Sequence, residues 1–335
     1  MAPTVYVITH YAQNHGSPDY RGMPLDPRFV ESDNNYVYFL IDEEVPEPLK
    51  GKRVLFEKEI DARLARLGAK HLAEWSFFLM EAEHSFCEYP FFAVSSRFYE
   101  KNFKLGGDLN SEWDRLFDYL RRYRWGYLPS YNRRLRWLHY EHEKQAALGA
   151  KEEFTPFNQR SFTIVDDLFD VKIPEEYGGW TDFQCNYIGF ASREDLLEYV
   201  EFYRPFFDHF FDEDWELKRD PAPYVQNTLR HFRNEKPLTY LLEFISHLFF
   251  FARGLKFFAL HYTGYYEIDE RHGRLERLER PEWATPAWTA SWVLHTRVVQ
   301  EIWPHLTPAR RARLQRGKAG LLAGLKRLTG RTSTA

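Results

Sequence analysis

The sequence predicts an α/β fold in which a mostly parallel sheet is flanked by helices. Short segments rich in Val, Ile, Phe and Tyr alternate along the chain with longer segments whose apolar residues recur at helical spacing. Strands that alternate with helices form mainly parallel sheets. With 335 residues, 44% of them hydrophobic, the chain is long enough to build a large core. We expect an α/β domain over residues 1–275, a helical extension over 276–306 and a basic tail over 307–335.

The expected strands are short apolar runs bounded by turn residues. The first is "TVYVITHY" at residues 4–11, and a polar, turn-rich loop follows it as far as Pro27. Further strands are expected at residues 35–41, 89–99, 161–169, 187–191 and 256–268. Apolar residues at helical spacing, together with capping residues, predict helices at residues 60–85, 110–123, 133–149, 194–211 and 237–253.

The segment "QCNYIGFAS" at residues 184–192 gives the sharpest local signal. Ser192 and Asp195 have the spacing of a capping box, in which each side chain accepts a bond from the backbone N–H of the other residue. A strand, Gly189 and a capped helix are therefore expected in that order. Gln184 and Asn186 stand at the entrance of this strand.

Composition argues against several classes of function. A net charge of −4 gives the whole molecule no attraction for nucleic acid. The two cysteines, Cys87 and Cys185, form neither a disulfide framework nor a zinc set, and the N-terminal residues lack the pattern of a signal peptide. We therefore expect a cytoplasmic protein. No G-x-G-x-x-G and no P-loop lysine motif occurs, which argues against a Rossmann dehydrogenase and an NTPase.

Polar residues stand at the ends of several expected strands. Ligands of open α/β sheets bind beyond the carboxyl ends of the strands. These polar residues are therefore the first candidates for a binding site: Thr9, His10, Ser95, Ser96, Arg97, Asp166, Asp167 and His261.

Three segments in this order resemble a family of bacterial glycosyltransferases from capsule and O-antigen gene clusters, which have a GT-A-like nucleotide-diphospho-sugar transferase fold. The segments are "VYVITHY", "CNYIGFASREDLLEYVEFYRPFFD" and "YLLEFISHLFFFARGLKFFAL", and the layout spans about residues 4 to 268. The family's His-Tyr-Arg-Arg strand end is replaced here by "SSRFY". The resemblance implies transfer of a sugar from a nucleotide-sugar donor to a glycan or lipid-linked acceptor in surface polysaccharide biosynthesis.

Glycosyl transfer needs a base for the acceptor hydroxyl and a positive group or metal for the leaving diphosphate. Glu243 is the first candidate base, because it lies on an otherwise apolar helix, where desolvation raises a carboxyl pKa. His247 follows one helical turn later. Asp166 and Asp167, at the end of "FTIV", are a second base or metal-ligand candidate. The alternative for Glu243 is a solvated helix position.

The donor and the acceptor have separate candidates. Thr9, His10 and Tyr11 form the expected nucleoside-binding loop, and Tyr11 offers a stacking ring. Arg21 and Arg97 suit the diphosphate, since arginine binds phosphate through two donors, and Ser95 ends the same strand as Arg97. The resemblance places the acceptor beside the strand at 187–191, so the expected acceptor-binding residues are Gln184, Asn186 and Gly189. The alternative for Asn186 is a cap on loop backbone.

Metal dependence stays open at this level, with Mn²⁺ and Mg²⁺ as the metals to consider. The one literal Asp-x-Asp, at Asp212 and Asp214, follows a helix among other acids and is expected on the surface. His139 and His142 lie three residues apart on an ordinary polar helix face, without the spacing of a zincin.

The tail at residues 307–335 contains eight Lys or Arg and no acid, so the rest of the chain carries −4 minus 8, or −12. Its leucines share one helical face: Leu314, Leu321, Leu325 and Leu328. A basic amphipathic helix is typical of proteins that bind an anionic membrane surface. We expect peripheral association with the inner face of the cell membrane, and a disordered basic tail is the alternative.

Two other classes of function compete with the transferase. A non-catalytic carbohydrate-binding protein would suit the aromatic content of 18%. A metal-dependent hydrolase could be built on Asp166 and Asp167, although the chain has no recognisable ligand spacing.

Overall fold

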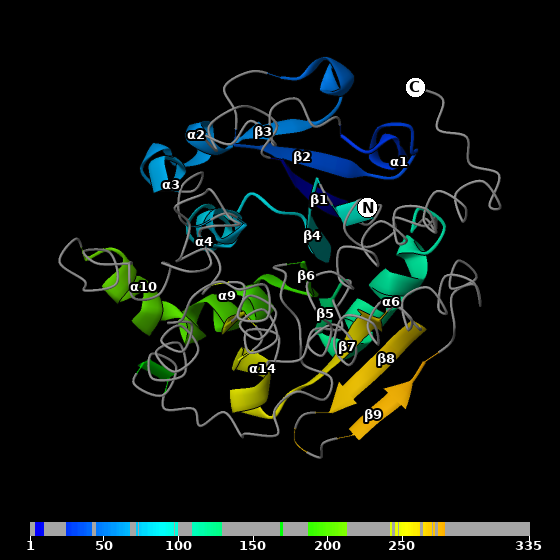
Figure 1. Ribbon diagram of the computed structural model, residues 1–335, viewed down its shortest axis with the longest axis vertical. Coiled ribbons are helices and arrows are strands. Elements are labelled where there is room, and N and C mark those ends of the chain that lie inside the picture. Colours follow the sequence, from blue (N-terminus) through cyan, green and yellow to red (C-terminus); the bar gives the residue numbers. More distant parts are fainter. Residues whose placement is uncertain are drawn as a thin grey trace, which may run out of the picture.

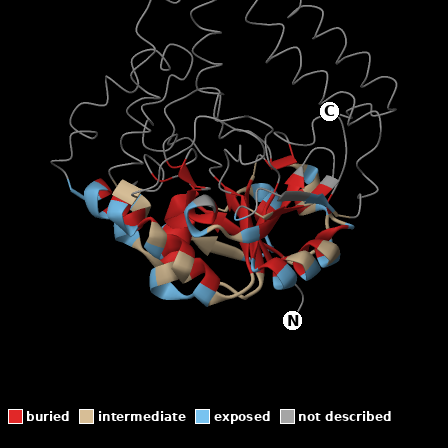
Figure 2. Ribbon diagram, turned by 90° about the horizontal axis from the view of Figure 1, so that it is seen from below, coloured by how far each residue is buried: buried red, intermediate tan, exposed pale blue. Residues whose placement is uncertain are grey.

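The protein folds around one mixed sheet with helices on both faces (Figure 1). The computed structural model describes residues 4–9, 25–41, 45–67, 72, 74–96, 98–99, 109–128, 168–169, 187–212, 242, 245–246, 248–261, 264–269, 271 and 274–278. Within them, buried residues concentrate in the sheet and on the helix faces turned towards it (Figure 2). This arrangement confirms the α/β class.

Within the described residues, the sheet has nine strands in the order β3-β2-β1-β4-β6-β5-β7-β8-β9. Every described residue of β1, β2 and β4 is buried, as expected for strands covered on both faces. The strands are β1 Thr4–Thr9, β2 Tyr36–Leu40, β3 Val54–Phe56, β4 Phe91–Ser95, β5 Trp125–Tyr127, β6 Ile188–Phe190, β7 Lys256–His261, β8 Gly264–Asp269 and β9 Arg274–Arg277.

Four of the eight pairings are parallel and four are antiparallel, so the sheet is mixed. Strands β1 to β5 and β7 nevertheless run in one direction, because β6 is reversed between β4 and β5. The carboxyl ends of these six strands therefore lie along one edge, together with the start of β6. We call this the carboxyl edge and the opposite one the amino edge.

Helices cover the two faces of the sheet unequally (Figure 1). One face carries α1 (Pro27–Val30) and α6 (Trp113–Tyr123). The other face carries α2 (Glu57–Ile60), α3 (Ala62–Leu67), α4 (Trp75–His84), α9 (Arg193–Phe202), α10 (Arg204–Phe210) and α14 (Leu248–Arg253). Residues alternate between these faces along β1. Val5 and Val7 belong to the core on the face of α1 and α6, and Tyr6 and Ile8 belong to the core on the other face.

Glycines in two strands make room for phenylalanine rings. Gly189 in β6 lies opposite Phe92 in β4, and a Cβ at Gly189 would overlap the Phe92 ring. Gly126 in β5 has the same relation to Phe258 in β7. The Phe92 ring therefore packs directly against the backbone of Gly189. This packing explains the glycine without a bound sugar.

The local prediction at Ser192 is confirmed. Its side chain accepts a bond from the Asp195 N–H at 3.2 Å, and the Ser192 N–H donates to Asp195 Oδ2 at 3.0 Å, which completes the capping box of α9. Arg124 donates to the other Asp195 oxygen at 2.6 Å. One capping carboxylate thereby joins α9 to the end of α6.

Several predicted elements have different bounds. The helix expected at 60–85 is divided into α2, α3 and α4, with Asp61 between the first two. The strand expected at 256–268 is a hairpin of the antiparallel strands β7 and β8, in which His261 pairs with Gly264. Of the strand expected at 161–169, only Leu168 and Phe169 are described, and both are helical. β9 extends the sheet to Arg277, two residues beyond the expected domain end.

Candidate functional site

Thr9 is the predicted site residue that the structure describes most fully. It ends β1 beside Leu40 of β2, and the Ser96 N–H that follows β4 donates to the neighbouring Ile8 carbonyl at 2.8 Å. The Thr9 side chain is fully buried, and within the described part of the chain its Oγ1 has no hydrogen-bond partner. A buried hydroxyl without a partner is costly and therefore rare. Thr9 thus offers an unused donor and acceptor at the carboxyl edge.

Ser95 ends β4 at the same edge, and its hydroxyl lies 2.6 Å from the hydroxyl of Tyr187. Both side chains are buried. Tyr187 immediately precedes β6, next in the chain to the predicted acceptor residue Asn186. The pair therefore joins the strand of the predicted donor residues to the strand of the predicted acceptor residues.

Three tyrosine hydroxyls converge near the carboxyl end of β5. Tyr127 and Tyr199 both donate to the carbonyl of Ser246, at 2.7 and 2.8 Å. Tyr203 donates to the carbonyl of Ile245 at 2.7 Å. Burial raises the pKa of Tyr199 well above its usual value, so this phenol keeps its proton and acts as a donor. Two segments of the family resemblance, around α9 and before α14, are thereby bonded to each other.

Most of the remaining site predictions lie outside the described residues. This holds for the catalytic candidates Glu243, His247, Asp166 and Asp167, for the donor candidates His10, Tyr11, Arg21 and Arg97, and for the acceptor candidates Gln184 and Asn186. The basic tail at 307–335 lies outside them as well. These assignments stay predictions. Leu242, Ile245 and Ser246, which flank Glu243, are fully buried.

Sequence reasoning missed the tyrosines and one carboxylate. Tyr127, Tyr187 and Tyr199 lie in apolar runs, where the sequence gives no sign of the partner of the hydroxyl. Glu57 follows β3 directly and is buried at 2% exposure, which places a second polar side chain beside the carboxyl edge. A charged residue immediately after an apolar strand was the available signal for Glu57.

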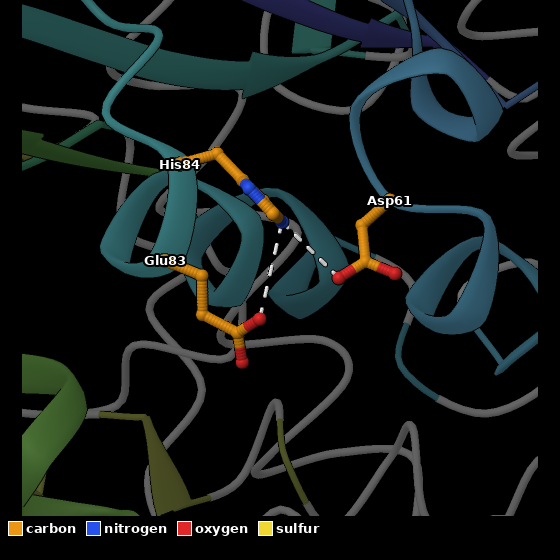
Figure 3. Close-up of side chains that lie close together, drawn as sticks. All are labelled: Asp61, Glu83 and His84. Atoms are coloured by element: carbon orange, nitrogen blue, oxygen red, sulfur yellow. Dashed lines mark hydrogen bonds and ion pairs between the residues drawn. The ribbon is translucent and has the colours of Figure 1, made fainter.

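One group within the described residues has the composition of a metal site. Asp61, Glu83 and His84 converge between α2 and the end of α4 (Figure 3). His84 Nε2 lies 3.2 Å from Asp61 Oδ2 and 3.9 Å from Glu83 Oε2. The Arg63 guanidinium lies 3.8 Å from Asp61 and 3.3 Å from Glu83.

This group is a helix cap with an ion-pair network around it. Asp61 accepts bonds from the N–H groups of Arg63 and Leu64 at the start of α3. Burial acts to raise the pKa of Asp61. The opposing effects are together larger and hold this pKa below its usual value: they come from the Leu64 N–H, His84, the Arg63 N–H and the Arg63 charge. Since Arg63 already supplies the positive charge, the arrangement is explained without a metal ion.

Comparisons of the chain with protein-family models, with curated proteins and with solved structures found no match. Within the described part of the chain, no helix has both the length and the apolar character needed to cross a membrane.

Proposed function

We propose that the protein is a glycosyltransferase that moves a sugar from a nucleotide-sugar donor to a glycan or lipid-linked acceptor in surface polysaccharide biosynthesis. The observation that carries the proposal is the strand order from β3 to β7, which is 3-2-1-4-6-5-7 with β6 alone reversed. This order brings the carboxyl ends of six strands, with Thr9 and Ser95 among them, to one edge, and open α/β sheets bind their ligands at such an edge. Fold alone does not determine an activity, so the site residues must support it too.

Thr9 supports the proposal from the carboxyl end of β1. Its buried hydroxyl has no partner among the residues that the structure describes, and a hydroxyl or phosphate oxygen of a nucleotide would provide one. His10 and Tyr11 continue the chain from Thr9 as the nucleoside-binding residues of this proposal. Arg21 and Arg97 are assigned to the diphosphate, because bidentate donors suit its charge.

Glu243 is assigned as the base, assisted by His247, with Asp166 and Asp167 as the second candidates. The base takes the proton of the acceptor hydroxyl, whose oxygen then bonds to the anomeric carbon of the sugar. The bond between that carbon and the diphosphate oxygen breaks, and the nucleoside diphosphate leaves. Gln184 and Asn186 are assigned to the acceptor, and the Ser95–Tyr187 bond keeps the two strand ends in contact.

The basic tail at 307–335 is assigned to the anionic inner face of the cell membrane. Each Lys or Arg near such a surface contributes about 1 kcal/mol, and the tail has eight of them. A transferase acting on a lipid-linked acceptor works at this surface.

Thermal unfolding with a panel of UDP, GDP, CMP and soluble glycans tests the function. A transferase is stabilised by one nucleotide class, by about 2.7 kcal/mol at a hundredfold excess over Kd. Thr9→Val should lose most of this stabilisation, whereas Thr4→Val, at the other end of β1, should keep it. Stabilisation by glycans alone would favour a carbohydrate-binding protein. Stabilisation by divalent metal without any nucleotide would favour a hydrolase.

A further inference from the structure

The hydroxyl of Tyr203 lies between a backbone carbonyl and a backbone N–H that would bond directly to each other in a regular α-helix. It donates to the Ile245 carbonyl at 2.7 Å and accepts a bond from the Phe249 N–H at 3.2 Å. In an unbroken α-helix this N–H would bond directly to this carbonyl, four residues earlier. The phenol is therefore inserted into the hydrogen-bond ladder, which is a known cause of helix opening.

The next carbonyl is diverted in the same way. Ser246 lies in a turn just before α14, and its carbonyl accepts the hydroxyls of Tyr127 and Tyr199. These donors come from separate elements, the end of β5 and the helix α9. The three tyrosines and the two carbonyls are all buried parts of one core, where each unmade hydrogen bond is costly. We call the described residues Ile245, Ser246, Leu248 and Phe249 the opened turn.

Because these hydroxyls and carbonyls are buried, the opening of the helix is a defined feature of the core. An intact helix would satisfy both carbonyls without any side chain, so Phe at the three tyrosine positions would fill the same core with fewer polar groups. The hydroxyls instead hold the Ile245 and Ser246 carbonyls outside the hydrogen-bond pattern of an α-helix. In the sequence, Ile245 and Ser246 stand between the proposed base Glu243 and His247.

We propose that Tyr203, Tyr127 and Tyr199 are positioning residues that set the backbone from which Glu243 and His247 extend. The inference rests on the proposed function for the role of the turn, although the turn itself does not depend on it. Glu243 lies two residues before Ile245 in the sequence, and His247 directly follows Ser246, so both are within two residues of a carbonyl that accepts a tyrosine hydroxyl. Consecutive Cα atoms are about 3.8 Å apart. A backbone shift there displaces the base, and displacements of about 1 Å cost up to about a hundredfold in rate.

Tyr203→Phe removes the inserted hydroxyl and keeps the ring. Tyr38→Phe is the matched control, because Tyr38 is also buried and donates to a backbone carbonyl, that of Phe29 at 3.2 Å, on the other face of the sheet. Two readouts are needed. Hydrogen exchange of peptides covering 242–250 reports on the turn, and release of nucleoside diphosphate from the nucleotide sugar chosen by the panel reports on chemistry.

Tyr203→Phe should change exchange in peptides 242–250, lower kcat by about tenfold or more, displace its pH profile and leave nucleotide affinity within about twofold. Tyr38→Phe should leave all four unchanged. Unaltered exchange in Tyr203→Phe would overturn the opened turn, and altered exchange with wild-type kcat would overturn the positioning role. A wild-type protein that binds no nucleotide would refute the proposed function instead, while exchange alone would still decide whether the turn is held by Tyr203.

Discussion

The two edges of the sheet use polar side chains in opposite ways. At the amino edge, Thr4 at the start of β1 accepts a bond from Asn35 at 2.6 Å and donates to Glu88 at 3.3 Å. Glu88 also accepts from Arg53 at 2.8 Å, and its N–H donates to Tyr6 at 2.9 Å. Residues next to the starts of β1, β2, β3 and β4 thus bond to one another.

At the carboxyl edge the same strand ends in Thr9, equally buried, and its hydroxyl has no partner among the described residues. Ser95 and Tyr187 bond across the edge, and Tyr127 at the end of β5 bonds to the opened turn. Polar groups at the amino edge therefore stabilise the fold. Open α/β sheets bind their ligands at the carboxyl edge, where the Thr9 hydroxyl lies.

The amino edge should be most sensitive at Glu81. This fully buried carboxylate accepts the N–H groups of Phe86 and Cys87, each at 2.7 Å, and the Tyr89 hydroxyl at 2.9 Å. Glu81→Leu removes the carboxylate that accepts three hydrogen bonds from the loop preceding β4 and should lower the free energy of unfolding by about 3–5 kcal/mol.

Glu81→Gln is the matched control, because its carbonyl oxygen can keep both backbone bonds and its amide can donate to the phenol. Chemical denaturation should find it at least about 2 kcal/mol more stable than Glu81→Leu. Equal losses in the two variants would mean that the carboxylate charge, and not its role as acceptor, holds this loop.

The two ends of β1 allow the same substitution to be compared directly. Thr4→Val removes the acceptor of the Asn35 amide and one of the donors to Glu88, which keeps its bond from Arg53, and should destabilise the protein by about 1–3 kcal/mol. Thr9→Val replaces a buried hydroxyl that has no partner among the described residues and should leave stability unchanged or raise it. Thermal unfolding without ligand decides the point. A loss at Thr9 as large as that at Thr4 would remove the difference between the edges.

The smallest expected effect concerns pH at the amino edge. The hydrogen bond from Arg53 holds the pKa of Glu88 below its usual value of 4.5, against the opposing effect of burial, and the Arg53 charge and Thr4 lower it further. A lowered folded-state pKa adds stability that is present above the unfolded pKa and is lost as pH falls through the folded one.

Stability measured from pH 6 to pH 3 should therefore fall less in Glu88→Gln than in the wild type. The difference should be small, because Arg53 and Glu88 are 46% and 36% exposed and water screens the pair. A variant with the wild-type pH dependence would show that Glu88 does not contribute.

The sequence by itself determined the elements whose signals are local. The strands β1, β2, β4 and β6, the helix α6 and the capping box at Ser192 all follow from periodicity, turn residues and capping spacing. The three-residue strands β3 and β5 escaped prediction, because neither is followed by the capping box that marked the equally short β6. Thr9 and Ser95 were predicted at strand ends, and each ends a strand in the structure.

Only the tertiary structure decided which polar groups are satisfied. Nothing in the sequence separates Thr4 from Thr9, since their difference arises from Asn35 and Glu88, which the sheet brings to one end of β1. Likewise, Tyr203 and Phe249 are 46 residues apart, and only packing of α9 against α14 inserts the phenol into the helix. Hydrogen bonds between distant residues depend on how the elements are arranged, which local patterns do not specify.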